Sequence, residues 1–283
     1  MLKKFVVIAF IITTLGCQTK SGGLSDGLVA TMVLLPHHLL VEERIQEVYE
    51  LVAKSRAETG QPLKRIFILS PDHFGYGASK VQLVSELGRF PVDQGMIKEL
   101  KDFELPLDAK SSTLEHGLTV HTSIAQNYFP EVQFVPIRLK NGANTQELKR
   151  LLSGLQENFN PRTDLLIASI DFAHYVSDDY AEPNDQKIME LIATDETSDL
   201  AELLVASKKL ANSPDPNEPL GVGIDSPESL AVLLAMRPNL GKELEIKTLE
   251  RTSTKTVTGI DVSKDNTSHL YAIWYGKPGP TNK

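Results

Sequence analysis

The sequence predicts a single α/β domain over residues 28–276, with a mainly parallel central sheet covered by helices on both faces. Short apolar runs rich in β-branched residues alternate along the chain with longer segments whose apolar residues recur at helical spacing. The short runs are apolar throughout, which is typical of parallel strands buried on both faces. A chain of 283 residues is long enough for one such domain, and no internal repeat or long linker divides it.

The expected elements follow in chain order, each with its own local signal. A strand at 28–35 precedes a helix at 42–59, and a break at 60–62 leads into a second strand at 65–69. A late helix at 226–236 begins with a serine cap followed by proline. The remaining elements are strands at 132–137 and 164–170, helices at 144–156, 184–194 and 198–208, and alternating strands at 244–256 and 269–275 that form an antiparallel pair or a sheet edge.

The N-terminus has the three-part layout of an export signal. Two lysines precede a short apolar run, and Thr14-Leu15-Gly16-Cys17 resembles the bacterial lipobox, in which the cysteine is acylated after cleavage. We therefore expect an extracytoplasmic, membrane-anchored lipoprotein; a plain signal peptide of a secreted or periplasmic protein and an uncleaved anchor helix are the alternatives. The expected segments are a signal peptide at 1–16, lipidation at Cys17, a flexible tether at 17–27 and a disordered tail at 277–283.

The charge balance and the single cysteine exclude several classes of function. Lysine and arginine total 29 against 37 acidic residues, a net charge of −8 without blocks of like charge, which argues against nucleic acid as a partner. Because Cys17 is the one cysteine, disulfide frameworks, cysteine-rich zinc sites and cysteine nucleophiles paired with histidine are excluded. No Gly-x-Ser-x-Gly elbow joins a predicted strand to a predicted helix, and no glycine-rich phosphate loop is present. A small molecule or another protein is the expected partner.

Six of the seven histidines fall into four groups along the chain. His37, His73 and His174 each follow the apolar end of a predicted strand, and ligands of open α/β sheets bind beyond the carboxyl ends of the strands. We therefore expect these three side chains to meet in space. Imidazole combined with carboxylate suits Fe, Cu and Zn, so a metal centre is predicted rather than a hydrolytic triad. His269, inside an alternating strand, is interpreted as a structural residue.

Four motifs within residues 30–236 resemble, in the same order, those of the Memo family, whose domain also occurs as protein B of the AmmeMemoRadiSam system. The family's fold is similar to that of class III extradiol dioxygenases, so the resemblance implies that fold here. The matching segments are Leu35-Pro36-His37, Ile66-Phe67-Ile68-Leu69-Ser70-Pro71-Asp72-His73, Glu115-His116-Gly117-Leu118 followed by Val135-Pro136-Ile137, and Ser169-Ile170-Asp171-Phe172-Ala173-His174-Tyr175.

The resemblance implies three metal ligands. His37 and His73 match histidine ligands of the family. Asp225 stands where Memo proteins have a cysteine and the dioxygenases a glutamate, so it would complete a set of two histidines and one carboxylate. From its local sequence alone, Asp225 could equally cap the helix at 226–236.

The resemblance also implies catalytic roles. Asp171 and His174 would line the site, with His174 as the acid/base group. Glu115 and His116 would position the substrate or support a ligand. The chain departs from the family after His37, where His38-Leu39-Leu40 replaces Ala-Gly-Tyr, and at Thr119, where a second glutamate is usual. His38 or His121 could therefore supply a replacement group.

The function expected from this resemblance is that of a metal-dependent, dioxygenase-like oxidoreductase. Fe(II) is the favoured ion, with Cu or Zn as alternatives, and the substrate would be a small molecule, aromatic or catechol-like. Two other classes stay open: a non-catalytic lipoprotein that binds a metal or a partner, and a Zn-dependent hydrolase.

Overall fold

The centre of the structure is an eight-stranded sheet with the strand order β4-β3-β5-β2-β6-β1-β8-β7. Its middle strands are parallel and almost entirely buried, which explains why their sequences are apolar throughout. These strands are β5 (Gln133–Leu139), β2 (Arg65–Pro71), β6 (Asp164–Ser169) and β1 (Val29–Leu35).

The computed structural model describes residues 27–277, except 76, 109–112, 195–196, 219, 241–243 and 261–265. In the part of the chain so described, no helix is long and apolar enough to cross a membrane. The expected signal peptide at 1–16 and the lipidated Cys17 lie outside these residues. So do the expected tether at 17–27 and tail at 277–283, except for residues 27 and 277.

Flanking strands extend the parallel core on both sides. β3 (Val81–Val84) pairs antiparallel with β5, and β4 (Leu107–Asp108) lies beyond it. On the other side β8 (Ser268–Gly276) runs antiparallel to β1, and β7 (Glu245–Ser253) pairs with β8 at the edge. The predicted mainly parallel sheet and its antiparallel C-terminal pair are both confirmed.

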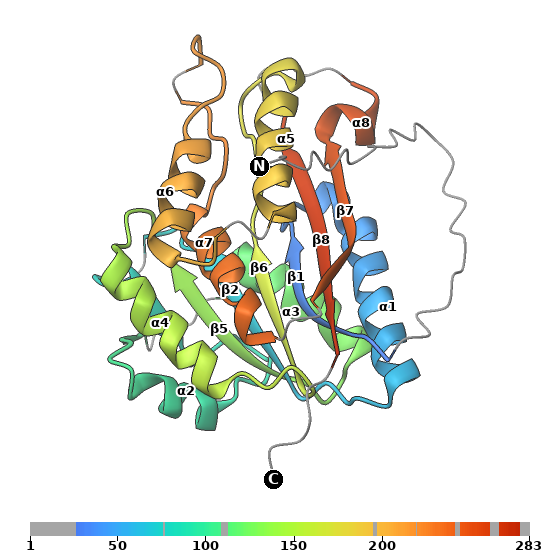
Figure 1. Ribbon diagram of the computed structural model, residues 1–283, viewed down its shortest axis with the longest axis vertical. Helices are drawn as coiled ribbons and strands as arrows, with labels where there is room; N and C mark the ends of the chain where they lie inside the picture. The colour runs from blue at the N-terminus through green and yellow to red at the C-terminus, as the bar shows by residue number, and fades with distance from the viewer. Residues whose placement is uncertain are drawn as a thin grey trace, which may run out of the picture.

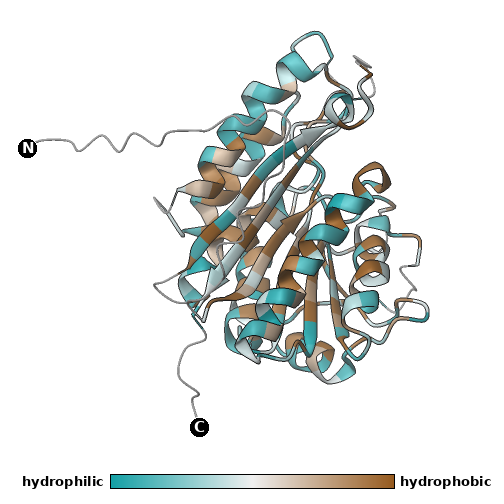
Figure 2. Cartoon of the chain, turned by 90° about the vertical axis from the view of Figure 1, so that its right-hand side faces the viewer, coloured by the Kyte–Doolittle hydropathy of each residue, from teal (hydrophilic) through white to brown (hydrophobic). Residues whose placement is uncertain are grey.

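Helices cover both faces of the sheet (Figure 1), as the sequence predicts. The apolar residues of the sheet lie between these helical layers, as Figure 2 shows by hydropathy. One face carries α1 (Glu42–Thr59) and α3 (His116–Tyr128). The other face carries α2 (Gln94–Lys101), α4 (Thr145–Asn158), α5 (Asp178–Ala193), α6 (Leu200–Ala211) and α7 (Pro227–Ala235).

The helix predicted at 184–194 begins earlier than expected, at Asp178, and runs through Pro183. Proline normally interrupts a helix because it lacks an N–H group and clashes with the preceding turn. Here a tertiary contact holds the first turns in place. Arg251 of β7 bonds Asp178 at 2.6 Å and Asp185 at 2.8 Å, so both ends of this stretch are fixed to the sheet.

Candidate metal centre

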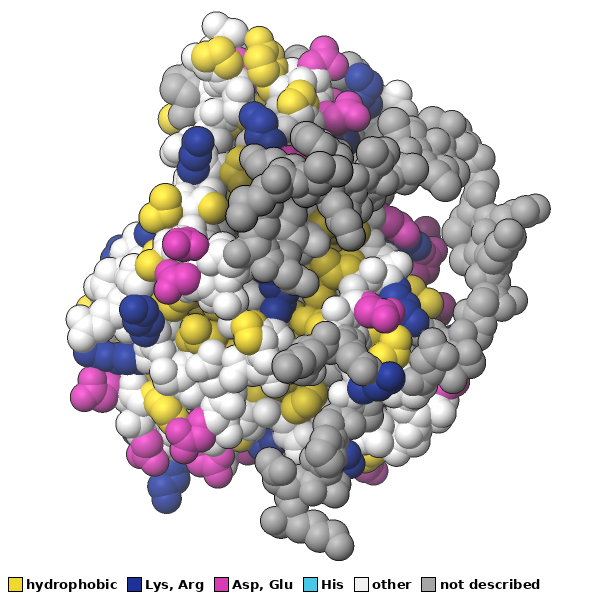
Figure 3. Space-filling model, viewed as in Figure 1, with side chains coloured by type: hydrophobic (Ala, Val, Ile, Leu, Met, Phe, Trp, Pro, Cys, Tyr) yellow, Lys and Arg dark blue, Asp and Glu magenta, His cyan; other side chains and the backbone are white. Residues whose placement is uncertain are grey.

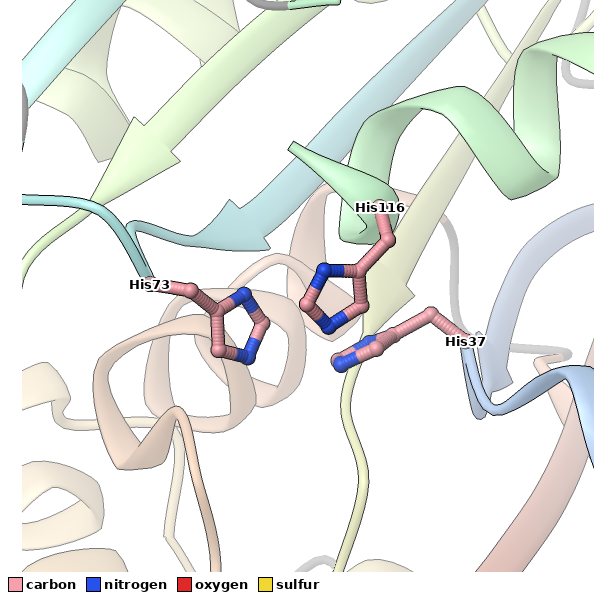
Figure 4. Close-up of side chains that lie close together, drawn as sticks. All are labelled: His37, His73 and His116. Atoms are coloured by element: carbon pink, nitrogen blue, oxygen red, sulfur yellow. The ribbon is translucent and has the colours of Figure 1, made fainter. Parts of the chain in front are cut away.

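Three parallel strands deliver site residues to the same edge of the sheet. His37 lies two residues beyond the end of β1, His73 two beyond β2 and Asp171 two beyond β6. Because these strands are hydrogen-bonded neighbours in parallel register, the three residues arrive close together. In Figure 4 the imidazole rings of His37, His73 and His116 converge from two of these loops and from the start of α3.

His37 is the buried member of the site, with an exposed fraction of 2%. Its backbone N–H donates to Asp171 Oδ1 at 3.0 Å, and its Nδ1 hydrogen-bonds with Ser169 Oγ at 3.0 Å. These contacts fix the ring so that Nε2 faces Asp225 Oδ2 at 3.3 Å. Burial, followed by the charges of the neighbouring histidines, lowers the pKa of His37 well below its ordinary value. The ring is therefore neutral, which is the form that binds a metal.

Glu115 holds His73 in place. The Glu115 carboxylate, which is fully buried, accepts a bond from the His73 backbone N–H at 3.0 Å and pairs with His73 Nδ1 at 2.7 Å. His73 Nε2 is left pointing towards Asp225 Oδ2, 3.8 Å away. Burial lowers the pKa of His73, but the carboxylates of Asp225 and Glu115 outweigh it and raise that pKa to about 10. Binding of a cation at Nε2 would therefore release a proton from His73.

Replacing Glu115 with glutamine should weaken metal binding about 10- to 100-fold, the usual effect of losing a group that orients a ligand. Glutamine keeps the size of the side chain but removes the charge that pairs with Nδ1 of His73. Competition with a chromophoric chelator measures the affinity. The matched control is Glu147→Gln, which alters the half-buried capping glutamate of another helix, α4, and should leave the affinity unchanged. Equal affinity in wild type and Glu115→Gln would contradict a supporting role for Glu115.

His116, the first residue of α3, joins the same cluster. Its ring stacks on His73 with 4.1 Å between centroids and lies 5.0 Å from the His37 ring. The three histidines offer nitrogen atoms within 4.8 Å of one another, so together they could hold a metal ion. From the sequence His116 is expected only to position the substrate or support a ligand, so the geometry adds a further possible donor.

A second possible donor set combines His37 with Asp171 and Asp225, whose ligand atoms also lie within 4.8 Å of one another. Within the described part of the chain, neither carboxylate oxygen of Asp225 has a hydrogen-bond partner, although both are buried. Burial raises the pKa of Asp225 to about 6, and burial together with Asp225 raises the pKa of Asp171 well above its usual value. Two buried, adjacent carboxylates repel each other unless a cation lies between them.

The alternative interpretation of Asp225 as a helix cap does not fit the geometry. A capping carboxylate accepts N–H groups of the first helical turn. The Asp225 oxygens accept none, and Ser226, at the N-cap of α7, makes no capping bond with its side chain. The side chain of Asp225 instead faces His37 and His73.

His174 lies near the cluster but belongs to neither donor set. Its backbone forms bridges with Val222 and Thr267, and its Nδ1 hydrogen-bonds with Thr267 Oγ1 at 3.2 Å. Burial lowers the pKa of His174 to about 4, so the ring is neutral near pH 7. The expected meeting of His37 and His73 is observed, whereas His174 stands apart from their donor set.

His38 and His121 were possible replacement groups, and neither joins the two donor sets. His38 Nδ1 accepts the backbone N–H of Leu40 at 3.3 Å and caps a short 3-10 helix, with its ring 5.3 Å from that of His269. His121 is fully buried between α3 and α1, where its Nδ1 lies 3.4 Å from Tyr49 Oη. Its place is in the core.

The buried His121 should make the metal-free protein sensitive to acid. Burial lowers the pKa of His121 to about 3, so below pH 6.5 the unfolded chain binds a proton that the folded chain does not. From pH 7 to pH 5 this lowers the free energy of unfolding by about 2 kcal/mol. Urea denaturation at pH 7 and pH 5 measures this change. Between the two pH values, the free energy of unfolding of His121→Leu should fall by about 2 kcal/mol less than that of wild type. The same loss in wild type and variant would contradict this assignment.

Comparisons with known proteins identify relatives of this chain. A family model described as Memo-like protein matches residues 16–263. Three curated relatives, each named a MEMO1 family protein, come from Nitrosopumilus maritimus (27% identical over 135 residues), Methanopyrus kandleri (25% over 163) and Pyrobaculum aerophilum (28% over 176). The matches cover 45%, 53% and 59% of this chain and 49%, 56% and 61% of the relatives. The chain thus spans less than two thirds of the length of these relatives.

A solved structure shows the same fold. The crystal structure of an uncharacterized protein from Escherichia coli K12 superimposes with a TM-score of 0.52 at 12% sequence identity, covering 86% of this chain and 99% of that chain. At this identity the likeness concerns the fold alone. The family model, in contrast, spans most of the sequence, including all the segments that deliver the site residues. On that match, the chain belongs to the family of Memo-like proteins.

Proposed function

We propose that this protein is a metal-binding oxidoreductase related to the dioxygenases, with Fe(II) as its ion and His37, His73 and Asp225 as ligands. One observation carries the proposal above all others. The buried Asp225 carboxylate oxygens have no hydrogen-bond partner in the described chain, and they face Nε2 of His37 at 3.3 Å and Nε2 of His73 at 3.8 Å. A buried carboxylate without a partner is costly, and a bound cation would remove that cost.

The chemistry of the donor set fits a divalent ion of the first transition row. Two imidazoles and one carboxylate are the set found at non-haem Fe(II) centres, and Zn and Cu accept the same donors. Asp225, and not a cysteine, faces the two histidines, and the one cysteine of the sequence, Cys17, lies outside the described residues. A bound Fe(II) would supply Lewis acidity and electron transfer to O₂.

His174 is the proposed group for proton transfer. Its Nδ1 is engaged by Thr267, so Nε2 is the atom that would accept a proton from a bound substrate. Burial keeps the ring neutral at pH 7, because it lowers the pKa to about 4. Asp171 supports the site differently, since it fixes the His37 backbone and raises the negative charge around the ion. Glu115 orients His73.

The proposed substrate is a small aromatic or catechol-like molecule, and the proposed location is a membrane surface outside the cytoplasm. The net charge of −8 favours neither nucleic acid nor an anionic membrane surface as a direct partner. Acidic and basic side chains are interspersed with hydrophobic ones on the face seen in Figure 3. The lipobox-like segment ending at Cys17 supports a lipid anchor, for which mass spectrometry of the mature N-terminus is the test.

Metal analysis of the purified full chain tests the central proposal. We expect about one equivalent of Fe per chain after anaerobic purification, by analogy with two-histidine, one-carboxylate sites. Oxygen consumption with a panel of catechols then separates turnover from storage of the ion. Tight Fe binding without oxygen uptake would favour a non-catalytic metal-binding protein. Oxygen-independent cleavage of esters by the Zn form would favour a hydrolase, and the lack of any tightly bound transition metal would overturn the proposal.

A further inference from the structure

A groove runs along α3 and reaches the histidine cluster at His116. It encloses about 540 Å³, and His116 is one of its lining residues. Thr119 and Ser123 line it at the next turns of the same helix, so it follows α3 outwards from the site. From His116 to Ile124 the helix rises about 12 Å, at 1.5 Å per residue. The groove is therefore as long as a medium-sized organic molecule, and its inner end is His116, whose ring lies against those of His73 and His37.

The lining of this α3 groove suits an uncharged, apolar body. Its apolar lining residues come from α3 and from the segments opposite it: Leu39, Leu87, Phe90, Val120 and Ile124. The charged lining residues among those described are Glu42 and Arg89, whose charges cancel, and the Arg89 guanidinium lies 5.3 Å from the centre of the Phe90 ring. An ionic occupant would find no net countercharge here.

Large exposed hydrophobic side chains lie within two residues of the site histidines in the sequence. Each loop that carries a site histidine also carries such a residue beside it. Exposed apolar residues that gather around a site mark a surface that binds apolar matter. These residues and their exposed fractions are Leu39 (67%), Phe74 (51%), Leu114 (66%) and Tyr175 (57%).

We propose that the substrate of this site is amphipathic, with a polar end that binds the metal through oxygen atoms and an apolar body that lies in the α3 groove. The inference rests on the proposed metal centre for the polar end and on the groove for the apolar body. A volume of about 540 Å³ falls within the roughly 300–1,000 Å³ typical of small-molecule sites. A folded partner would need a much larger surface, on the order of 800 Å² per side.

Alkyl hydroxamates of increasing chain length test this proposal. The hydroxamate group binds a metal through two oxygens, and the alkyl chain stands for the apolar body. Calorimetric titration of the full-length Zn-loaded protein with acetohydroxamate through octanohydroxamate gives the affinity at each length. We expect a gain of about two- to fourfold per methylene, or roughly 60- to 4000-fold over the six methylenes that separate the two compounds.

A large side chain in the groove should abolish this gain. Ser123 is exposed on α3, so Ser123→Trp would fill the groove without disturbing the core. We expect it to bind acetohydroxamate as wild type does and octanohydroxamate no better than acetohydroxamate. Val205→Trp, at a position of α6 that is 71% exposed, is the matched control and should retain the full gain. Thr119→Trp repeats the test one turn nearer to His116 if Ser123→Trp does not fold.

The outcomes separate the two proposals. If acetohydroxamate binds but longer chains bind no more tightly, the metal centre stands and the proposal of an amphipathic substrate is wrong. An undiminished gain in a folded Ser123→Trp or Thr119→Trp protein would also overturn the groove as the binding site. If the protein retains no Zn and binds no acetohydroxamate, the metal centre fails and the substrate proposal fails with it.

Discussion

Replacing His37 with alanine is expected to reduce the affinity for the metal ion about 1000-fold or more, beyond the 10- to 100-fold typical for losing a supporting residue. His37 is the one residue shared by both possible donor sets, so no alternative set of the described residues can compensate for it. Its ring is buried and hydrogen-bonds with Ser169 through Nδ1, while Asp171 accepts a bond from its backbone N–H. The variant would leave the Asp171 and Asp225 carboxylates without the imidazole whose Nε2 lies 3.5 Å and 3.3 Å from them.

Two measurements test the His37→Ala prediction. Metal content after dialysis against a weak chelator should fall from near one equivalent to near zero. The gain in melting temperature on adding metal should disappear as well, because a ligand stabilises a protein only in proportion to its binding. His38→Ala changes the adjacent residue, which belongs to neither donor set, and should bind metal within a few-fold of wild type. Near-normal affinity in His37→Ala would place the ion elsewhere.

The strand ends of this site could be predicted from the sequence because each is marked by a local pattern. β1, β2 and β6 are continuous apolar runs, and a polar site residue follows two positions after each one. Parallel pairing then brings His37, His73 and Asp171 to one edge, by a rule that holds for all open α/β sheets. The sequence alone therefore predicts that reactive residues at the ends of such strands lie close together.

Residues positioned by long-range contacts could not be placed in the same way. His116 enters the cluster through the packing of α3, and Glu115 links that helix to His73 across 42 residues of sequence. His174 is turned aside because its backbone pairs with Val222 and Thr267, which no periodic pattern foretells. The first turns of α5 are also held by a long-range contact, since Arg251 bonds Asp178, and the helix begins six residues before the expected start at 184. These contacts depend on how the helices and loops pack.

Asp225 was placed by the family resemblance, while its local sequence left a helix cap equally open. The structure separates the two interpretations by what the carboxylate contacts, which is the neighbourhood of His37 and His73 and not the N–H groups of α7. Asp225 should therefore strengthen metal binding and lower the stability of the metal-free protein. Buried carboxylates without hydrogen bonds destabilise a protein, so this site should lower the free energy of unfolding while no cation is bound.

Asp225→Asn should therefore stabilise the metal-free protein and weaken metal binding at the same time. Burial raises the pKa of Asp225 to about 6, so the unfolded chain loses its proton at a lower pH than the folded chain does. Between about pH 4 and pH 6 the free energy of unfolding of wild type falls as pH rises, and above pH 6 the deficit stays at about 2–3 kcal/mol. Asparagine does not ionise but also loses the ion pair with His73, so the variant should be more stable by less than the whole deficit, about 1 kcal/mol at pH 7.

The control for Asp225→Asn is a buried carboxylate that already has its partners. Asp164 is fully buried and accepts two bonds of 3.0 Å from Arg65, so Asp164→Asn should destabilise the protein by about 2–4 kcal/mol, because it leaves a charge unpaired. Urea denaturation in EDTA measures both variants, and chelator competition measures their metal affinity. The same chemical change should thus have opposite effects on stability at the two positions, while only Asp225→Asn lowers metal affinity, by about 100-fold or more. A loss of stability in metal-free Asp225→Asn would show that this carboxylate has a structural partner and would remove the main support for the metal centre.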